Sequence, residues 1–292
     1  MISFIKKYLP FARASFLDLL AYKFVIFCWL IVDILSILVS FFVWTAVFSS
    51  SSASGGIPLD QVVINGFTYK EMISYVLIIF LFSICVNTSN TMDAISSEVQ
   101  DGSIAMQLIK PISYRVRFIF SSLGTLFSVN ILLGIPLLIV SYTVLTLCGF
   151  IPFLGVGNLL IRSGLFFLAE IIACLLTDSF NYIFGVFSFY TLASFGLFNI
   201  KNGIQNFLSG TLIPMTFMKN SSWSIVRNIG MVLDYSPFVY MAQYPTFILM
   251  GKIDYLTSVN SLLIAIAWLV AFELIGHLLY SNAIKKVIIQ GG

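Results

Sequence analysis

The sequence predicts an all-α polytopic membrane protein with six transmembrane helices, an N-terminal amphipathic helix at the membrane interface, and outer re-entrant segments before the last span. Of its 292 residues, 59% are hydrophobic and only 9% are charged, which excludes an ordinary soluble composition. The 29 Phe, 13 Tyr and 4 Trp exclude a disordered chain. Apolar residues also run continuously over about 20 positions instead of alternating with polar ones, which predicts helices rather than barrel strands.

Six apolar stretches are long enough to cross the hydrocarbon core of a bilayer. The first greatly exceeds the roughly 7–15 apolar residues of a signal peptide, so it is predicted to be a span. The third is long enough to tilt or kink at Pro136. The fourth and fifth are separated only by the polar residues 178–181, which predict a tight turn between them. The predicted spans are residues 24–48, 72–91, 118–147, 159–177, 182–200 and 256–280.

The basic residues predict the orientation of the bundle, because cytoplasmic loops retain Lys and Arg. With the N-terminus inside, nine of the 15 Lys and Arg residues fall on the cytoplasmic side. Both termini are therefore predicted in the cytoplasm, in a multi-pass protein of the cell membrane. The four cysteines lie in or at the ends of different apolar stretches without a CxxC pair, and are typical of small buried hydrophobes: Cys28, Cys85, Cys148 and Cys174.

The N-terminal segment predicts an amphipathic helix along the inner membrane surface. Pro10 suits the first turn of such a helix. Arg13 and Asp18 lie off the apolar face, and the same pattern would also serve as a plain membrane anchor. The residues that share the apolar face are Phe11, Ala12, Phe16, Leu19 and Leu20.

The long connection 201–255 contains two apolar stretches, neither of which is a clean span. Gly210 and Pro214 interrupt the stretch 204–218, and a second stretch, 229–250, is broken in the same way by Asp234, Pro237 and Pro245. Two short segments that dip into the outer leaflet and return are expected, because freed backbone groups are tolerated there only against other helices or a wet cavity. The alternative is a set of loops that lie loosely at the interface.

The loop 93–117, between the second and third spans, is predicted to carry a short helix. Gly102 can end the preceding helix and Ser103 can cap the new one. Pro111 stops it, because the residue before a proline is pushed out of the helical region. Exposed apolar residues on such a helix favour contact with another protein, and the alternative is that the loop packs against its own bundle. The apolar residues of the helix are Ile104, Met106, Leu108 and Ile109.

The order of these features resembles the type-two ATP-binding-cassette (ABC) export permeases. From Glu98 to Ser113, an acidic residue and a glycine precede a short apolar helix and a Lys-Pro pair, as in the loop of that family. The stretch 207–214, FLSGTLIP, with the later pairs Ser-Pro at 236–237, Tyr-Pro at 244–245 and Gly-Lys at 251–252, is similar to the family's outer connection. The resemblance covers essentially the whole chain and rests on the order of the motifs.

The resemblance implies a permease subunit of an ATP-driven exporter that forms half of a translocation pathway in the lipid bilayer. It would pair with a second permease subunit, identical or paralogous, and with two cytoplasmic ABC ATPase subunits, and it implies no nucleic-acid partner. Gly210 and Pro214 would lie at an outer gate. The loop 93–117 would be a coupling helix seated in a cleft of the ATPase, with contacts from Glu98, Asp101, Gly102, Ser103, Met106, Leu108 and Lys110.

Motifs for nucleotide binding and catalysis are absent from the sequence. No stretch matches G-x-x-x-x-G-K-[ST], the loop that cradles nucleotide phosphates. A single histidine excludes an HExxH zinc site, and no GxSxG elbow occurs. The chain is therefore predicted to be no enzyme and to bind neither cofactor nor metal, with ATP and Mg used by the partner ATPase.

Three acids lie deep in the predicted spans: Asp33, Glu170 and Glu273. Intramembrane charges mark either a pathway or a buried polar contact. Glu273 and His277 are four residues apart and share a helix face, so they can bond to each other. These four residues are candidate pathway or intersubunit polar sites. In the alternative function, an ion-coupled secondary transporter or channel would use them as its relay, although no internal repeat of the kind such transporters show is evident.

Overall fold

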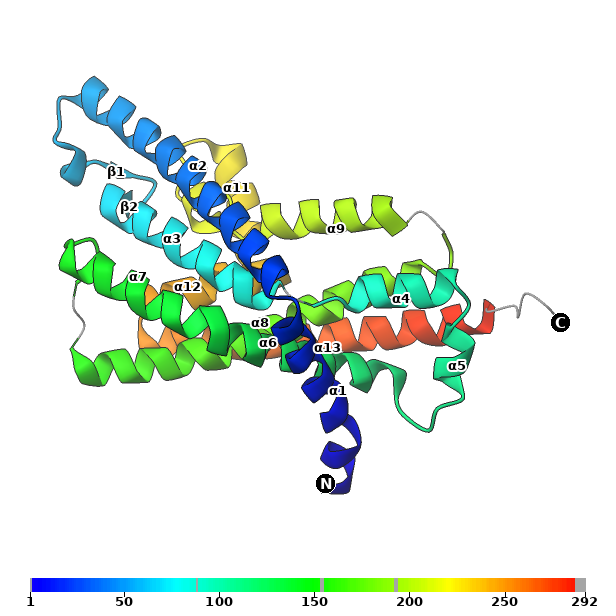
Figure 1. The fold of residues 1–292 in the computed structure, drawn as a ribbon. Helices are drawn as coiled ribbons and strands as arrows, with labels where there is room; N and C mark the ends of the chain where they lie inside the picture. The colour runs from blue at the N-terminus through cyan, green and yellow to red at the C-terminus, as the bar shows by residue number, and fades with distance from the viewer. Residues whose placement is uncertain (1, 88, 153–154, 192–193, 287–292) are drawn as a thin grey trace.

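Long helices joined by short connections make up the computed structural model, which describes residues 2–87, 89–152, 155–191 and 194–286 (Figure 1). Five lengths of helix within these residues are long and apolar enough to cross a membrane, where the sequence predicted six. They are α2 (Lys23–Gly55); α3 (Tyr69–Val86) with α4 (Thr91–Gln100); α6 (Tyr114–Val129) with the π-helical turn η2 (Asn130–Gly134) and α7 (Ile135–Leu147); α8 (Val156–Phe187); and α13 (Tyr255–Ala283).

The predicted turn at residues 178–181 is wrong, because α8 continues through it without a break. All four of these polar and aromatic residues are buried, and bonds from neighbouring helices satisfy their polar groups. A helix with internally satisfied polar side chains needs no exposed turn. The predicted spans 159–177 and 182–200 are consequently not two neighbouring helices: residues 182–187 end α8, and residues 194–200 begin α9 (Ser194–Leu208).

Two ends of the bundle can be distinguished by the elements that lie there. The hairpin end carries 3-10 helix η1 (Leu59–Gln61) and the antiparallel strands β1 (Val63–Ile64) and β2 (Phe67–Thr68), which precede α3. A capping box at Thr68 and Glu71 then starts α3. The opposite end, called the loop end, carries α5 (Ile104–Leu108), which follows α4 (Figure 1).

The segment after α8 travels from the loop end back to the hairpin end. Phe195 and Phe198, at the start of α9, line a cavity with residues of α4. After a turn at residues 209–214, the short helix α10 (Met215–Lys219) ends beside the hairpin, where the Asn220 amide donates to the Asn65 carbonyl at 3.1 Å. Lys201 and Gln205 of α9 are buried and bonded to α8 and to Asn87 at the end of α3, so the polar side of α9 faces the bundle.

Short helices, rather than loose loops, fill the region before α13. They are α11 (Ser224–Leu233), the 3-10 helix η3 (Pro237–Met241) and α12 (Gln243–Met250), which packs against α3 and α8. The region begins at residue 209 rather than at 201, because residues 201–208 belong to α9. Lys252 follows α12 and lies at the hairpin end, where its Nζ contacts Glu71 at 3.0 Å.

Both ends of the described chain lie at the loop end. Helix α1 (Ile2–Ala21) crosses α6, and the Tyr8 hydroxyl accepts a hydrogen bond of 2.8 Å from the Ser113 backbone N–H. Ala283 is fully buried near the end of α13, before the 3-10 helix η4 (Ile284–Lys286), and packs in one cluster with Ile95 and Ile104. Pro10 lies inside α1 and not in its first turn as predicted, because the helix already begins at Ile2. The predicted apolar face of α1 is half-buried or buried against α6.

Candidate functional site

The turn between α4 and α5 has the backbone that the sequence predicts, with a different cap. Helix α4 ends at Gln100, and Gly102 adopts a left-handed φ of 74°. Ser103 precedes α5 but makes no side-chain capping bond, so the predicted serine cap is wrong. The Asp101 carboxylate instead accepts the Ser103 N–H at 2.8 Å. Bonds from the Ser103 hydroxyl and N–H hold the pKa of Asp101 below its ordinary value.

Helix α5 has one anchored and several projecting apolar residues. Ile104 is 3% exposed and packs with Ile95 of α4 and Tyr114 of α6. Met106 and Ile109 are 62% and 76% exposed, at the loop end of the bundle. Helix α5 therefore packs against the bundle through Ile104 and presents its other apolar side chains outward. Ile109 is the most exposed of them, yet it was left out of the predicted contact set.

The predicted contact residues divide between the surface and the interior. Glu98 lies on the inner side of the loop, where its carboxylate accepts from Arg117 Nη2 at 2.9 and 3.0 Å and from the Tyr114 hydroxyl at 2.8 Å. This acid ties α4 to α6 and is 14% exposed. Lys110 Nζ donates to Gln107 within the loop at 2.7 Å. The predicted contact residues that are exposed are Asp101, Gly102, Met106, Leu108 and Lys110, and Ser103 is half-buried.

A charged cluster lies behind this loop, and of its charged members the sequence analysis named only Glu273 as a candidate site residue. Arg115, near the start of α6, contacts Asp178 of α8 at 2.5 Å and Glu273 of α13 at 2.5 Å. Its Nη2 also donates to the Ser179 hydroxyl at 3.1 Å. The guanidinium carbon lies 4.7 Å from the centre of the Tyr182 ring. One side chain thus joins three long helices.

Hydroxyl groups complete the charged cluster on the other side of Asp178. This carboxylate is fully buried and accepts from Ser89 at 2.7 Å, from Ser122 at 2.6 Å and from Thr91. A buried carboxylate requires both a counter-charge and satisfied lone pairs, and Asp178 has both. Ser89 and Thr91 flank the junction of α3 and α4, so the cluster also holds the helix that leads into α5.

The deep acids named from the sequence have separate environments. Glu273 accepts from Arg115 and from the Ser179 hydroxyl at 2.6 Å. His277 is exposed and, among the described residues, makes no bond to Glu273, although the two share a helix face. Glu170 is 1% exposed and accepts from Asn130 at 2.9 Å, at the first residue of the π-helical turn. Asp33 lies half-buried on α2, and the described residues contain no group of three His, Cys, Asp or Glu that suits a metal ion.

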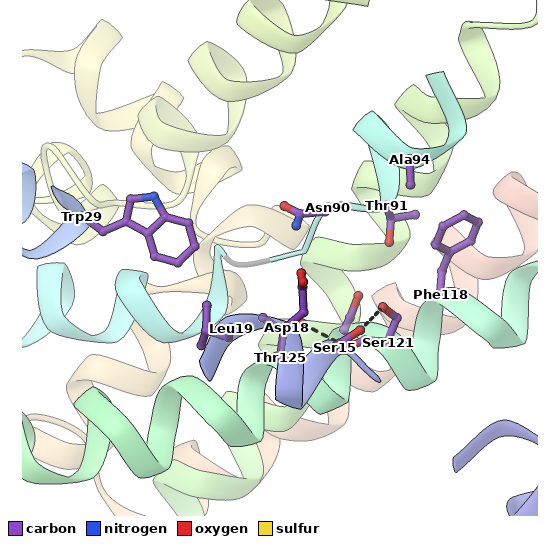
Figure 2. Close-up of a pocket in the computed structure, with 11 residues that line it drawn as sticks. Ser15, Asp18, Leu19, Trp29, Asn90, Thr91, Ala94, Phe118, Ser121 and Thr125 are labelled. Atoms are coloured by element: carbon purple, nitrogen blue, oxygen red, sulfur yellow. Dashed lines mark hydrogen bonds between the residues drawn. The ribbon is translucent and has the colours of Figure 1, made fainter. Parts of the chain in front are cut away.

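A cavity of about 110 Å³ lies between α1, α4 and α6, beside the start of α4 (Figure 2). Asp18 and Asn90 point into it, and Trp29 of α2 stands at one side. Below them, the Ser15 and Ser121 hydroxyls are bonded at 2.6 Å and join α1 to α6. The cavity is small, and Trp29 in its wall belongs to the N-terminal part of α2.

The predicted gate residues come together in the turn 209–214. Gly210 has a φ of 85°, and its carbonyl accepts from the Tyr75 hydroxyl of α3 at 2.8 Å. Pro214 is buried at the start of α10, where the next N–H, of Met215, donates to the Gln243 side chain of α12 at 2.6 Å. The turn is therefore wedged between α3 and α12.

Replacing Gly210 with valine should lower the free energy of unfolding by about 2 kcal/mol, from left-handed strain and crowding together. A Cβ there would meet Gln243 Oε1 at 2.8 Å and the Tyr75 hydroxyl at 3.0 Å. Thermal unfolding of the purified chain measures the loss. Gly203→Val on α9, where a Cβ meets no atom within 4 Å, is the matched control and should change stability much less. Equal effects of the two changes would contradict a strained turn.

Comparison with known proteins places this geometry in a family. A family model described as "ABC-2 family transporter protein" matches residues 59–291, which is more than half of the chain. The match begins at the hairpin end and includes the loop with α5, the charged cluster, the turn 209–214 and α13. No curated protein and no solved structure matches the chain.

Proposed function

The chain belongs to the ABC-2 transporter family and is a permease component of an ABC transporter, and from this premise we propose that it couples through α5 to cytoplasmic ATPase subunits that drive export. The observation that carries the proposal is a pair of exposed apolar side chains, one on α5 and one directly after its last residue. Met106 and Ile109 project from the loop end while Ile104 anchors their helix to the bundle. Apolar groups that project beyond the membrane spans favour burial against a protein partner.

The charges around α5 support the proposal that this helix binds in a cleft of the ATPase. Asp101 precedes the helix and Lys110 follows it, and both are exposed. Charged residues at the rim of an apolar contact give orientation, while the apolar centre gives most of the affinity. The sequence has no phosphate-cradling loop, so in this proposal ATP and Mg are bound by two ABC ATPase subunits.

The charged cluster supports a rigid connection from α5 to the rest of the bundle. Glu98 ties α4 to α6, and Arg115 ties α6 to α8 and α13. Separating buried partners costs several kcal/mol, so a displacement of α5 would move these helices together. We expect closure of the ATPase pair to rotate the permease bundles from an inward-open to an outward-open arrangement.

Six crossings, with α9 and α10 as an interrupted fifth, complete the proposal. The 15 residues of α9 extend over about 22 Å, less than the roughly 30 Å of a hydrocarbon core. The turn 209–214 and α10 supply the remaining distance, because Asn220 reaches the hairpin. With α5 in the cytoplasm of a cell-membrane protein, both termini are cytoplasmic, and α1 lies along the inner interface.

A second permease subunit, identical or paralogous, would form the other half of the pathway. Helix α2 exposes large apolar residues along most of its length, and α9 exposes Ile200 and Phe207. The interior of the single chain is filled, with Tyr75, Phe82 and Phe166 fully buried. These facts favour a pathway between two subunits over one through a single bundle, with Gly210 and Pro214 beside its outer gate.

Changing Met106 or Ile109 to glutamate should reduce ATPase activity stimulated by the permease by at least about tenfold in the purified complex, because a charge would enter an apolar seat. The stability of the permease alone should stay unchanged, since both side chains are exposed. Val63→Glu is the matched control, on a residue that is 62% exposed at the hairpin end. Undiminished stimulation in both Met106→Glu and Ile109→Glu would contradict this role of α5. Failure of any ATPase to co-purify would favour the ion-coupled alternative.

A further inference from the structure

Three cavities follow one another along α2 from the loop end toward the hairpin end. The first is the small cavity of Figure 2, with Asp18 and Trp29 in its wall. Trp29 also lines the second, of about 290 Å³, together with Asp33 and residues of α3. The third, of about 250 Å³, is entirely apolar. We call the second and third cavities the α2–α3 groove; their lining residues are Trp29, Val32, Asp33, Ser83, Ile84 and Asn87, and Ile37, Leu38, Phe41, Ile73, Val76 and Leu77.

The groove exists because α2 is fastened to the bundle mainly near the hairpin end. There, Trp44 and Phe48 are buried, and their rings lie 5.2 Å from Phe217 and 5.8 Å from Tyr69. Toward the loop end, α2 exposes Phe24, Phe27 and Val32. A helix held at one end by large aromatic residues leaves space beside its other half, and residues of α2 and α3 line that space.

The polar end of the groove offers hydrogen-bond acceptors and the face of an aromatic ring. Asp33 is half-buried and has no hydrogen-bond or ion-pair partner within the part of the chain that the structure describes. Ser83 donates its hydroxyl hydrogen to the Ile79 carbonyl at 2.8 Å, which leaves the Ser83 oxygen able to accept. Trp29 adds an indole ring, and none of the residues that line the groove is Lys or Arg. Carboxylate oxygens and an indole face together recognise a cation.

We propose that the α2–α3 groove binds an amphipathic organic cation, with its charged head at Asp33 and Trp29 and its apolar body between Ile37 and Leu77. An unpaired carboxylate at membrane depth is costly, and a bound cation offsets that cost. Only aliphatic and aromatic side chains line the adjoining cavity, which suits a hydrocarbon or aromatic body. Each cavity is close to the lower limit, about 300 Å³, of sites for drug-sized ligands. That the cation is transported cargo rests on the proposed function; its binding does not.

Equilibrium binding of radiolabelled tetraphenylphosphonium to the purified full chain in phosphatidylcholine nanodiscs tests the proposal. Asp33→Asn should weaken binding by at least about tenfold, because a charge-assisted contact is lost. Trp29→Leu should weaken it severalfold, and Trp29→Phe less, because Phe keeps an aromatic face. Asp60→Asn, the same chemical change on an exposed residue at the hairpin end, is the matched control and should bind as the parent does.

Three outcomes would overturn the proposal. The first is parental affinity in Asp33→Asn, whose correct folding is verified by its thermal unfolding. The second is equal competition by tetraphenylborate, which has the same shape and the opposite charge, because the groove would then select apolar shape alone. The third is displacement of the probe by added phosphatidylethanolamine, which would assign the groove to lipid. No ATPase takes part in this binding measurement, so its result can be interpreted even if the α5 experiment fails. A failure to bind the cation would likewise leave the result of the α5 experiment interpretable.

Discussion

Replacing Arg115 with methionine should lower the free energy of unfolding by about 3–5 kcal/mol, because removal of one partner leaves buried charge uncompensated. Asp178 is fully buried and would lose its only ion-pair partner among the described residues. Glu273 would remain next to it as a second carboxylate, with only the Ser179 hydroxyl still donating to it. Unfolding of the purified chain in mixed micelles, followed by circular dichroism, measures the loss.

A second substitution separates charge from packing. Asp178→Asn in the Arg115→Met background should recover part of the lost stability, because the uncompensated charge disappears while the shape is kept. Arg227→Met, on an exposed residue of α11, should change the stability by less than about 0.5 kcal/mol. If Arg115→Met were as mild as Arg227→Met, the charged cluster would not hold the helices together.

The charged cluster also shows why the sequence predicted the spans more successfully than their connections. The long apolar stretches are visible locally, and five lengths of helix cover five of the six predicted spans. Polar residues at 178–181 interrupt such a stretch, and a local pattern cannot distinguish a turn from a buried polar contact. The partner that decides between them, Arg115, is 63 positions away from Asp178. Its position before an apolar stretch suggested a cytoplasmic loop residue instead.

In the candidate site too, the glycine breaks, which have a local cause, were predicted correctly, and the side-chain directions that depend on distant partners were not. Gly102 and Gly210 were recognised as breaks because a left-handed backbone favours glycine regardless of distant contacts. Glu98 was expected at the surface, and its inward direction depends on Arg117 from the next helix. Lys201 was assigned to an outer loop, and its burial depends on Asn181 of α8. Side-chain direction in a bundle is set by partners that the sequence order does not bring together.

Helix α1 crosses α6 so closely that the crossing admits only a glycine at position 124. A Cβ on Gly124 would lie 2.6 Å from the Cα and 2.7 Å from the carbonyl carbon of Ala12, and closer still to its oxygen. These are backbone atoms, which cannot move aside as the end of a side chain can. The crossing also brings together Ser15 with Ser121 and Tyr8 with Ser113. Helix α1 therefore contacts both α6 and the connection between α5 and α6.

Gly124→Val should therefore displace α1 and lower the free energy of unfolding by about 3 kcal/mol, at the upper end of the range for overpacking. Trypsin should cleave the folded chain faster at the exposed Arg13, because α1 would open without global unfolding. Gly164→Val on α8, where a Cβ meets nothing within 4 Å, is the matched control and should leave cleavage at Arg13 unchanged. Since Tyr8 accepts from Ser113, release of α1 would also loosen the connection between α5 and α6. ATPase stimulation should then fall together with protection of Arg13, and a loss of protection without any loss of stimulation would show that α5 is positioned independently of α1.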